Sequence, residues 1–220
     1  MGELINFIAK NHNRTTRDYL PRMVDNKVIC MDIAKKYDKD FWDGDRKYGY
    51  GGYVYDGRWK TVAEELIHYY QLSINSKILD VGCGKGFLLY EISKLLPGVT
   101  FYGFDISQYA INHAKPEIRN NIYVYDTKDP YPYGDKYFDL IISLTSLHNL
   151  QIFHLKNALQ EIERVGRNKF ICVESYRTNQ ELFNLQCWAL TCESFYQPQE
   201  WIWLFKEFGY SGDYEFIYFE

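Results

Sequence analysis

A glycine-rich segment near the middle of the chain, Asp80–Gly86, has the residue types and the spacing of a ligand-binding turn. Its sequence is DVGCGKG, with glycines at positions 82, 84 and 86. In such a turn, backbone N–H groups can approach a ligand closely, and the N-terminus of the following helix favours negative charge. A dinucleotide-binding turn would have a further glycine where Phe87 stands. The spacing therefore argues against a nicotinamide cofactor.

Two acidic residues further along the chain extend this pattern. Asp105 ends the segment YGFD, 19 residues beyond Gly86. An acid at the end of the second strand accepts hydrogen bonds from ribose hydroxyls, and about 20 residues is the usual separation from the glycine turn. A third apolar segment is followed by Asp126 and Thr127. Together, the turn and the spaced acid predict a site for a ligand that contains a ribose.

The segments around these residues alternate between strand and helix patterns. We expect strands over 77–81, 99–104, 122–125, 138–143, 169–174 and 214–219, and helices over 87–96, 107–114, 154–165, 179–190 and 198–208. This alternation predicts a Rossmann-like, doubly wound α/β fold. The sheet would be mostly parallel, with six or seven strands, right-handed crossovers and helices on both faces. The apolar helical segments are expected to bury Trp188, Trp201 and Trp203.

Residues 1–60 do not follow the alternation. The stretch from Asp40 to Trp59 mixes glycine and aromatic residues in a way that we take to exclude a regular helix. We therefore expect an N-terminal helical and aromatic cap over residues 1–60, lying on the ligand edge of the sheet. The main, ligand-binding domain would then span residues 61–220.

Over about residues 75–175, this order of strand, glycine turn, helix and acid resembles the class I S-adenosylmethionine-dependent methyltransferases of the small stand-alone bacterial type. The resemblance implies that the glycine turn and the acid before it hold the methionine part of the cofactor. The second-strand acid would bind the ribose, with the residue after it beside the adenine, and the third-strand acid would accept from the adenine amino group. The cofactor-binding residues implied in this way are Asp80, Gly82, Cys83, Gly84, Gly86, Asp105, Ile106, Asp126, Thr127 and Ser143.

The sequence departs from that family in two places. VGRNK replaces the usual Lys-Pro-Gly-Gly turn before the fifth strand, and no antiparallel seventh strand is evident before Glu220. Either the sheet is short at that edge, or the last strand takes the seventh position directly.

Methyl transfer is an in-line displacement at a sulfonium carbon, so the protein mainly positions the acceptor and, where needed, removes its proton. His148, beyond the fourth strand, is the candidate general base, and a purely structural histidine is an equally good reading. The candidate acceptor-binding residues follow the fifth strand or lie in the aromatic stretch. They are Glu174, Tyr176, Arg177, Tyr50, Tyr53, Tyr55, Arg58 and Trp59. The aromatic residues are interpreted either as a lid or as packing between the cap and the sheet.

Composition limits the function further. The net charge of −4 argues against nucleic acid as the main substrate, because phosphate binding usually needs a basic surface. No apolar stretch approaches the roughly 20 residues of a membrane span. Five cysteines without a CxxC pair or a secretory signal predict reduced thiols in a cytoplasmic protein. We expect no metal site.

We therefore expect methyl transfer from S-adenosylmethionine to a polar small molecule, with S-adenosylhomocysteine as the product. The whole chain resembles a bacterial group of which some relatives lie among genes for surface-polysaccharide or modified-sugar synthesis, which suggests a sugar or its phosphorylated precursor as the acceptor. A protein or RNA methyltransferase, a non-catalytic S-adenosylmethionine-binding subunit and a nicotinamide dehydrogenase stay open as alternatives. The RNA reading is weak, because SLTS stands at 143–146 where a base clamp would be expected. The sequence does not predict the acceptor atom or the oligomeric state.

Overall fold

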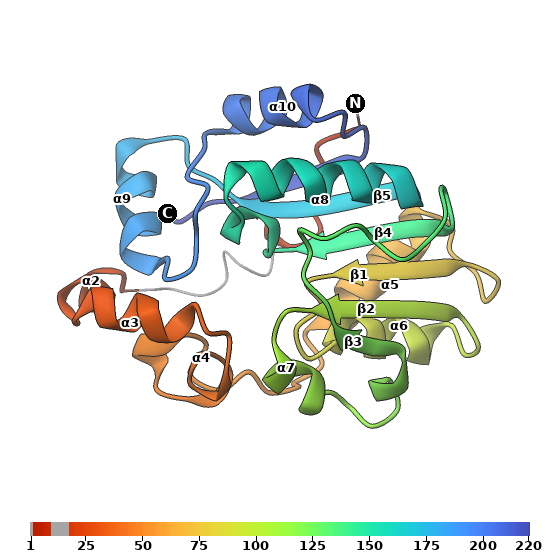
Figure 1. The fold of residues 1–220 in the computed structure, drawn as a ribbon, viewed down its shortest axis with the longest axis horizontal. Coiled ribbons are helices and arrows are strands. Elements are labelled where there is room, and N and C mark those ends of the chain that lie inside the picture. The colour runs from red at the N-terminus through yellow and green to blue at the C-terminus, as the bar shows by residue number, and fades with distance from the viewer. Residues whose placement is uncertain (1, 10–17) are drawn as a thin grey trace.

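A six-stranded sheet forms the centre of the computed structural model, which describes residues 2–9 and 18–220 (Figure 1). The strand order is β3-β2-β1-β4-β5-β6, and every neighbouring pair is parallel. The strands are β1 (Lys77–Val81), β2 (Thr100–Asp105), β3 (Ile122–Val124), β4 (Phe138–Leu144), β5 (Gly166–Glu174) and β6 (Asp213–Ile217). The expected Rossmann-like α/β fold is confirmed.

Helices cover both faces of the sheet, as parallel strands require when the chain must cross over between them. They are α2 (Leu20–Val24), α3 (Lys27–Ala34), α4 (Lys39–Asp43), α5 (Trp59–Tyr69), α6 (Phe87–Leu95), α7 (Gln108–Asn112), α8 (Ile152–Val165), α9 (Asn179–Trp188) and α10 (Pro198–Glu207). Single 3₁₀ turns lie at η1 (Arg46–Tyr48), η2 (Arg119–Asn121) and η3 (Leu147–Asn149). Helices α8 and α10 cover one face, and α5 and α6 cover the other (Figure 1).

The core has two layers, one on each face of the sheet. Leu66 of α5 and Leu89 of α6 are fully buried against one face, and Leu159 of α8 and Trp201 of α10 are fully buried against the other. Trp203 is 58% exposed, so its expected burial was wrong. Side chains that are two residues apart on a helix point to nearly opposite sides. Trp201 and Trp203 therefore cannot both face the sheet.

The connection after β3 returns the chain to β4 on the other side of β1, so the strand order reverses between β1 and β4. In open α/β sheets, the crevice outside the carboxyl ends of the strands at such a reversal is where ligands bind. Figure 1 shows α2, α3 and α4 on the side of the sheet toward which the strand arrows point. The N-terminal elements therefore face the carboxyl ends of the strands.

One local expectation for the N-terminal segment was wrong. The stretch from Asp40 to Trp59 does contain helix, because α4 runs from Lys39 to Asp43. The Asp38 side chain accepts a hydrogen bond from the backbone N–H of Lys39, and Gly44 follows the last residue of this single turn. The division into a cap over residues 1–60 and a main domain over 61–220 stays a prediction; α5 begins at Trp59.

The outer edge of the sheet resolves the question of the last strand. β6 takes the place directly beside β5, and its residues pair in parallel register, from Phe170 with Asp213 to Glu174 with Ile217. An isolated parallel bridge joins Leu4 to Tyr214 on the outer side of β6. In the described residues the sheet is thus fully parallel rather than mostly parallel.

Candidate cofactor and acceptor site

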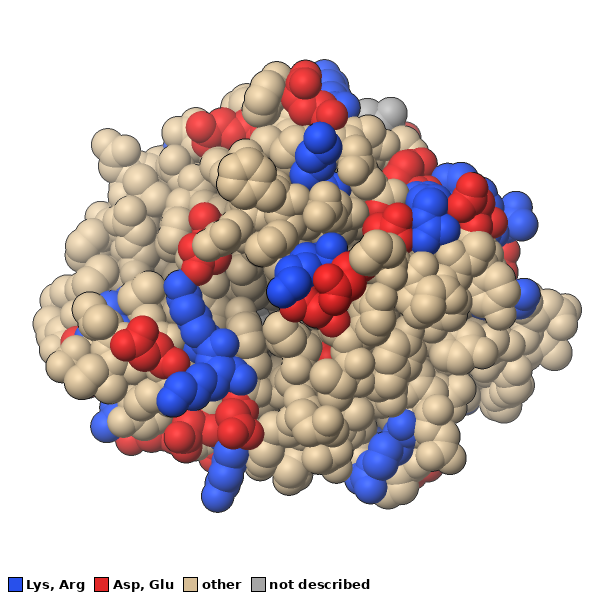
Figure 2. All heavy atoms as spheres, viewed as in Figure 1, with Lys and Arg blue, Asp and Glu red and all other residues tan. Residues whose placement is uncertain are grey.

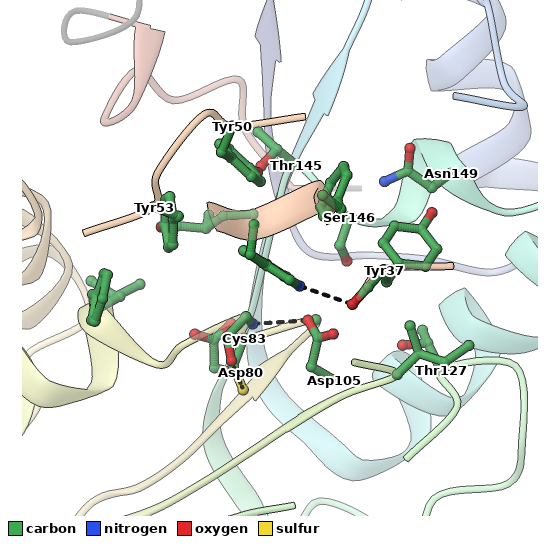
Figure 3. A pocket seen from close by; sticks show the side chains of 18 of the residues that line it. Tyr37, Tyr50, Tyr53, Asp80, Cys83, Asp105, Thr127, Thr145, Ser146 and Asn149 are labelled. Atoms are coloured by element: carbon green, nitrogen blue, oxygen red, sulfur yellow. Dashed lines mark hydrogen bonds between the residues drawn. The ribbon is translucent and has the colours of Figure 1, made fainter. Parts of the chain in front are cut away.

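A cavity of about 470 Å3 opens at the carboxyl ends of β1, β2 and β4, at the point where the strand order reverses. Its walls come from the sheet on one side and from the N-terminal segment on the other (Figure 3). The expected cofactor residues that line it are Asp80, Gly82, Cys83, Gly84, Asp105, Ile106, Asp126 and Thr127. The expected acceptor residues that line it are Tyr50, Tyr53, Arg58 and Trp59. A cavity of this size is typical of small-ligand sites.

The glycine turn has a backbone that only glycine adopts easily. Gly82 has φ of 76° and Gly84 has φ of 56°, both in the left-handed region. A Cβ atom on Gly82 would lie 2.3 Å from the Ser146 hydroxyl oxygen, and one on Gly84 would lie 2.8 Å from the Trp42 ring. The turn is therefore pressed against the loop after β4 on one side and against the N-terminal segment on the other.

Asp105 fixes the turn from the neighbouring strand. One carboxylate oxygen accepts from the Gly84 N–H at 2.8 Å (Figure 3). The other accepts from the Ser107 N–H at 2.8 Å. Ser107 caps α7 as expected, because its hydroxyl accepts from the Ala110 N–H. Each carboxylate oxygen can accept a further bond, so the anchored group can still accept from ligand hydroxyls.

Two buried carboxylates lie in the same wall. Asp80 is 4% exposed and Asp105 is 8% exposed, and neither forms an ion pair with a residue that the structure describes. Burial, with the nearby Asp105 charge, raises the pKa of Asp80 to about 8, and burial also raises the pKa of Asp105. Two buried acids in a cavity wall favour a ligand that brings positive charge and hydroxyl donors. S-Adenosylmethionine carries both, so these residues fit it.

The remaining lining residues on the sheet side are more varied. Burial raises the pKa of the Cys83 thiol well above its ordinary value, so it stays protonated and is not a nucleophile. Ile106 is half exposed at the rim. The Asp126 carboxylate pairs with the Lys128 ammonium at 2.7 Å, and both line the cavity with Thr127.

Two of the expected cofactor residues lie outside the cavity wall. Gly86 precedes α6, and a Cβ atom there would face Ile118 rather than the cavity. Ser143 is fully buried within β4, and its hydroxyl donates to the Val81 carbonyl at 2.8 Å. The wall at the end of β4 is formed instead by Leu144, Thr145 and Ser146.

The N-terminal segment is attached to the glycine turn by a partly buried ion pair. The Lys85 ammonium contacts both carboxylate oxygens of Asp43 at 2.7 Å and donates to the Tyr53 carbonyl at 2.8 Å. The Lys85 side chain is only 5% exposed. Asp43 also accepts from the Tyr109 hydroxyl and the Tyr53 N–H, and these donors with Lys85 lower its pKa although burial opposes them. This network fixes the height of the cap above the turn.

The aromatic residues of the N-terminal segment both pack against the sheet and line the cavity, so the two interpretations from the sequence apply together. Tyr50 stacks on Trp42, and Tyr53 stacks on Phe87, while all four line the cavity. They pack the cap to the sheet and also form the cavity wall. Tyr55 does not line it, because its hydroxyl bonds to Glu91 and its ring packs on Tyr90.

His148 does not line the main cavity. The residue is 3% exposed, Nδ1 accepts from the Glu174 backbone N–H at 3.3 Å, and Nε2 lies 3.4 Å from a Glu174 carboxylate oxygen. Burial lowers the pKa of His148 to about 3. With Nδ1 already accepting and Nε2 facing a carboxylate, the neutral ring has no lone pair directed at an acceptor. This arrangement suits the structural reading rather than a general base.

The other residues expected after the fifth strand diverge. Glu174 lines a second, smaller cavity. Tyr176 is half-buried against the core layer under α5 and α6. Arg177 pairs with Glu181 and with Glu220 and stacks on Tyr218, which places it outside both cavities.

Several lining residues were not identified from the sequence. Tyr37, Trp42, Asn149 and His154 all line the main cavity. Trp42 donates through Nε1 to the Ser107 hydroxyl at 2.8 Å, across 65 residues of sequence. The only available signals were the aromatic clustering before Trp59 and the polar residues after β4, and neither indicates which side chains point inward.

Comparison with known proteins assigns the chain to a family. A model described as a methyltransferase domain matches residues 72–209. The chain belongs to this methyltransferase-domain family. The expected class I, Rossmann-like methyltransferase is confirmed at the level of family and fold, and S-adenosylmethionine is the cofactor that this membership supports. The nicotinamide alternative is set aside.

Two curated relatives are distant in sequence. An uncharacterized methyltransferase of Synechocystis is 28% identical over 114 residues, which cover 51% of this chain and 53% of the relative. The mitochondrial arginine-hydroxylase NDUFAF5 of Mus musculus is 27% identical over 109 residues, covering 50% of this chain and 31% of the relative. The chain thus spans about half or less of the length of these relatives.

Two solved structures share the fold. An S-adenosylmethionine-dependent methyltransferase from Archaeoglobus fulgidus aligns with a TM-score of 0.54 at 20% identity, over 69% of this chain and 68% of that one. A chain from the complex between the Haloferax volcanii Trm112 methyltransferase activator and its methyltransferase aligns with a TM-score of 0.53 at 20% identity, over 70% of this chain and 73% of that one. These similarities concern the fold.

Proposed function

We propose that this methyltransferase-family protein transfers a methyl group from S-adenosylmethionine to a polar small molecule, of which a sugar or its phosphorylated precursor is the favoured class. The observation that carries the proposal is one cavity with two kinds of wall. Buried acids and the glycine turn form the wall on the sheet side. Aromatic side chains from the segment 37–59 form the opposite wall. A concave site of about 470 Å3 has room for a cofactor and a small acceptor, as small-ligand sites do.

The sheet side would bind the cofactor. Asp80 and the backbone of Gly82 and Gly84 would hold the methionine part, and Asp105 would accept from the ribose hydroxyls. Asp126 and Thr127, at the rim beyond β3, would face the adenine with Ile106. When bound, S-adenosylmethionine supplies an electrophilic methyl carbon on a cationic sulfur.

The remaining residues would position the acceptor. Thr145 and Ser146 lie at the end of β4 in the same wall as the glycine turn, so an acceptor beside them would be close to the bound methionine part. The aromatic rings of Tyr50 and Tyr53 would exclude water from that space and fix a flat or hydroxylated molecule by packing. These groups would align the acceptor with the methyl carbon, and none of them would act as a nucleophile.

The charge distribution favours a small acceptor over nucleic acid. On the face seen in Figure 2, Lys and Arg side chains are interspersed with Asp and Glu and form no continuous basic surface. Ion pairs such as Arg58 with Asp56 on the cavity side use the cations locally. A nucleic-acid enzyme would need unpaired basic groups along the path of the phosphates.

A cytoplasmic location is part of the proposal. The five cysteines are free thiols, four of them buried, which accords with a cytoplasmic protein. Within the described ranges, no helix is both long and apolar enough to cross a membrane.

Calorimetric titration with S-adenosylmethionine, S-adenosylhomocysteine and NAD tests the cofactor first. We expect micromolar binding of the two adenosyl ligands and none of NAD, and then release of S-adenosylhomocysteine with sugar or sugar-phosphate acceptors. Absence of binding by both adenosyl ligands would overturn the proposal. Tight binding without turnover on any small molecule would favour the non-catalytic subunit, or a need for a protein activator such as the one in the Haloferax complex.

A further inference from the structure

A second cavity of about 200 Å3 adjoins the cofactor cavity and has a different character. The two share wall residues, namely Phe41, Tyr50, Thr145, Asn149 and Ile217. The second cavity is lined by two guanidinium groups, from Arg22 of α2 and Arg46 of η1, and by one carboxylate, from Glu174. Among its described lining residues, cationic side chains therefore outnumber anionic ones.

The two arginines are held against the same indole ring. The guanidinium carbon of Arg22 lies 4.3 Å from the centroid of Trp188, and that of Arg46 lies 4.7 Å from it. Arg22 donates to the carbonyls of Trp188, Arg46 and Gly49. These three bonds leave two of its five N–H groups for a ligand.

The charges of Asp25 and Glu174 offset that of Arg22 only in part, because neither of these described carboxylates forms an ion pair with it. Within residues 2–9 and 18–220 it forms no ion pair, and its bonds go to backbone carbonyls. Burial and the neighbouring Arg46 charge lower its pKa to about 10. Two cations on one ring in a concave wall repel each other, and an anion between them would relieve that repulsion.

The passage between the two cavities is formed by fixed polar groups. Thr145 has φ of 53°, an unfavourable conformation for a β-branched residue, and its N–H donates to the Cys172 carbonyl at 2.8 Å. The Asn149 amide oxygen accepts from the Thr191 hydroxyl at 2.8 Å, which leaves the amide N–H groups directed into the cavity (Figure 3). Both residues can therefore contact an acceptor that reaches from one cavity to the other.

We propose that the second cavity binds an anionic group of the methyl acceptor, a phosphate or a carboxylate, between Arg22 and Arg46. The methyl-accepting atom would then lie beside Thr145 and Asn149 in the cofactor cavity. Guanidinium groups suit this task because their N–H groups match the oxygens of a phosphate or carboxylate in pairs. This inference rests on the proposed methyltransferase function and specifies the charge of its substrate.

The test uses the full chain saturated with S-adenosylhomocysteine. Inorganic phosphate and acetate are titrated by calorimetry at constant ionic strength, with chloride as the balancing anion. We expect saturable binding of at least one of them, and the tighter of the two identifies the acceptor group as phosphate or carboxylate. No saturable binding of either anion overturns the inference, while normal S-adenosylhomocysteine binding in the same sample would leave the proposed function intact.

Variants distinguish this site from general attraction of anions. Arg46→Gln should weaken anion binding at least tenfold and leave S-adenosylhomocysteine binding within twofold of the wild type. Arg22→Lys keeps the charge and should weaken anion binding less than Arg22→Gln does. The lysine variant replaces Arg22→Gln in the test if the glutamine variant fails to fold. Arg167→Gln is the matched control, because Arg167 lies at the amino end of β5 and pairs with Asp139. Equal anion affinity in Arg46→Gln and the control would also overturn the inference.

Discussion

The affinity of the protein for S-adenosylmethionine should rise steeply with pH because of Asp80. Its carboxyl group is buried beside Asp105, and its pKa is about 8 in the ligand-free protein. At pH 6 it is therefore almost entirely neutral. The methionine part of S-adenosylmethionine carries an ammonium group, and we expect it to bind beside the ionised Asp80 carboxylate. Binding then releases the Asp80 proton, so the affinity grows about tenfold per pH unit below the raised pKa. Between about pH 5.5 and 7.5 the increase should be roughly 100-fold.

The window is chosen so that most of the ligand stays protonated. An α-amino group has a pKa of about 7.7–8.0, so it is protonated at about pH 5.5 and only partly deprotonated at about pH 7.5. Calorimetry in two buffers of different ionisation enthalpy measures both the affinity and the proton released. Asp80→Asn should bind more weakly than the wild type at pH 7.5 and should lose the pH dependence. A wild-type affinity that is flat from pH 5.5 to 7.5, with no proton release, would refute the assignment of Asp80 to the ammonium.

The raised pKa of Asp80 also makes the stability of the ligand-free protein depend on pH. Because the native state holds the Asp80 proton more tightly than the unfolded chain does, the free energy of unfolding decreases as pH rises from the ordinary value of 3.8 toward 8. Asp80→Asn should remove that part of the pH dependence in urea unfolding. An identical pH profile for wild type and variant would contradict the raised pKa.

Three further predictions concern neighbouring residues. Asp105→Ala should weaken adenosyl-ligand binding at least about 100-fold in calorimetry, since two bonds at about 1.5–3 kcal/mol each are lost; unchanged affinity would exclude it from ribose binding. Lys85→Met should lower the free energy of unfolding in urea by about 2 kcal/mol, because the partly buried Asp43 carboxylate loses its ammonium partner, whereas Lys60→Met at an exposed pair should change it little. Gly82→Ala should destabilise more than Gly98→Ala: both have positive φ, but only at Gly82 would the new methyl group lie 2.3 Å from a hydroxyl oxygen. Equal losses in thermal unfolding would show that the close approach is relieved without cost.

The sequence by itself determined the parallel α/β fold and the sheet side of the cavity. The reason is that these features depend on short separations along the chain. Apolar runs separated by helical segments specify parallel strands, and parallel strands bring their carboxyl ends to one edge. Asp80, the glycine turn and Asp105 end adjacent strands, so their positions in the chain place them together.

Burial within β4 could not be inferred in this way. A central parallel strand is buried on both faces, so alternation does not indicate which side chains reach the cavity. Ser143 therefore looked like a lining residue, yet it points to the Val81 carbonyl, and the cavity wall begins after it. His148 likewise has the chemistry of a base, but burial lowers its pKa, and the backbone N–H of Glu174, 26 residues away, occupies Nδ1.

Only the tertiary structure decided what the N-terminal segment contacts. The pair of Lys85 with Asp43 spans 42 residues, and the bond from Arg22 to the Trp188 carbonyl spans 166. Nothing in the local pattern of residues 20–59 encodes these partners, because the glycine and aromatic residues there permit many loop paths. The chosen path is selected by burial of the rings against the sheet and by ion pairs that form only once the sheet is assembled. The position of the second cavity and its two arginines follows from that packing.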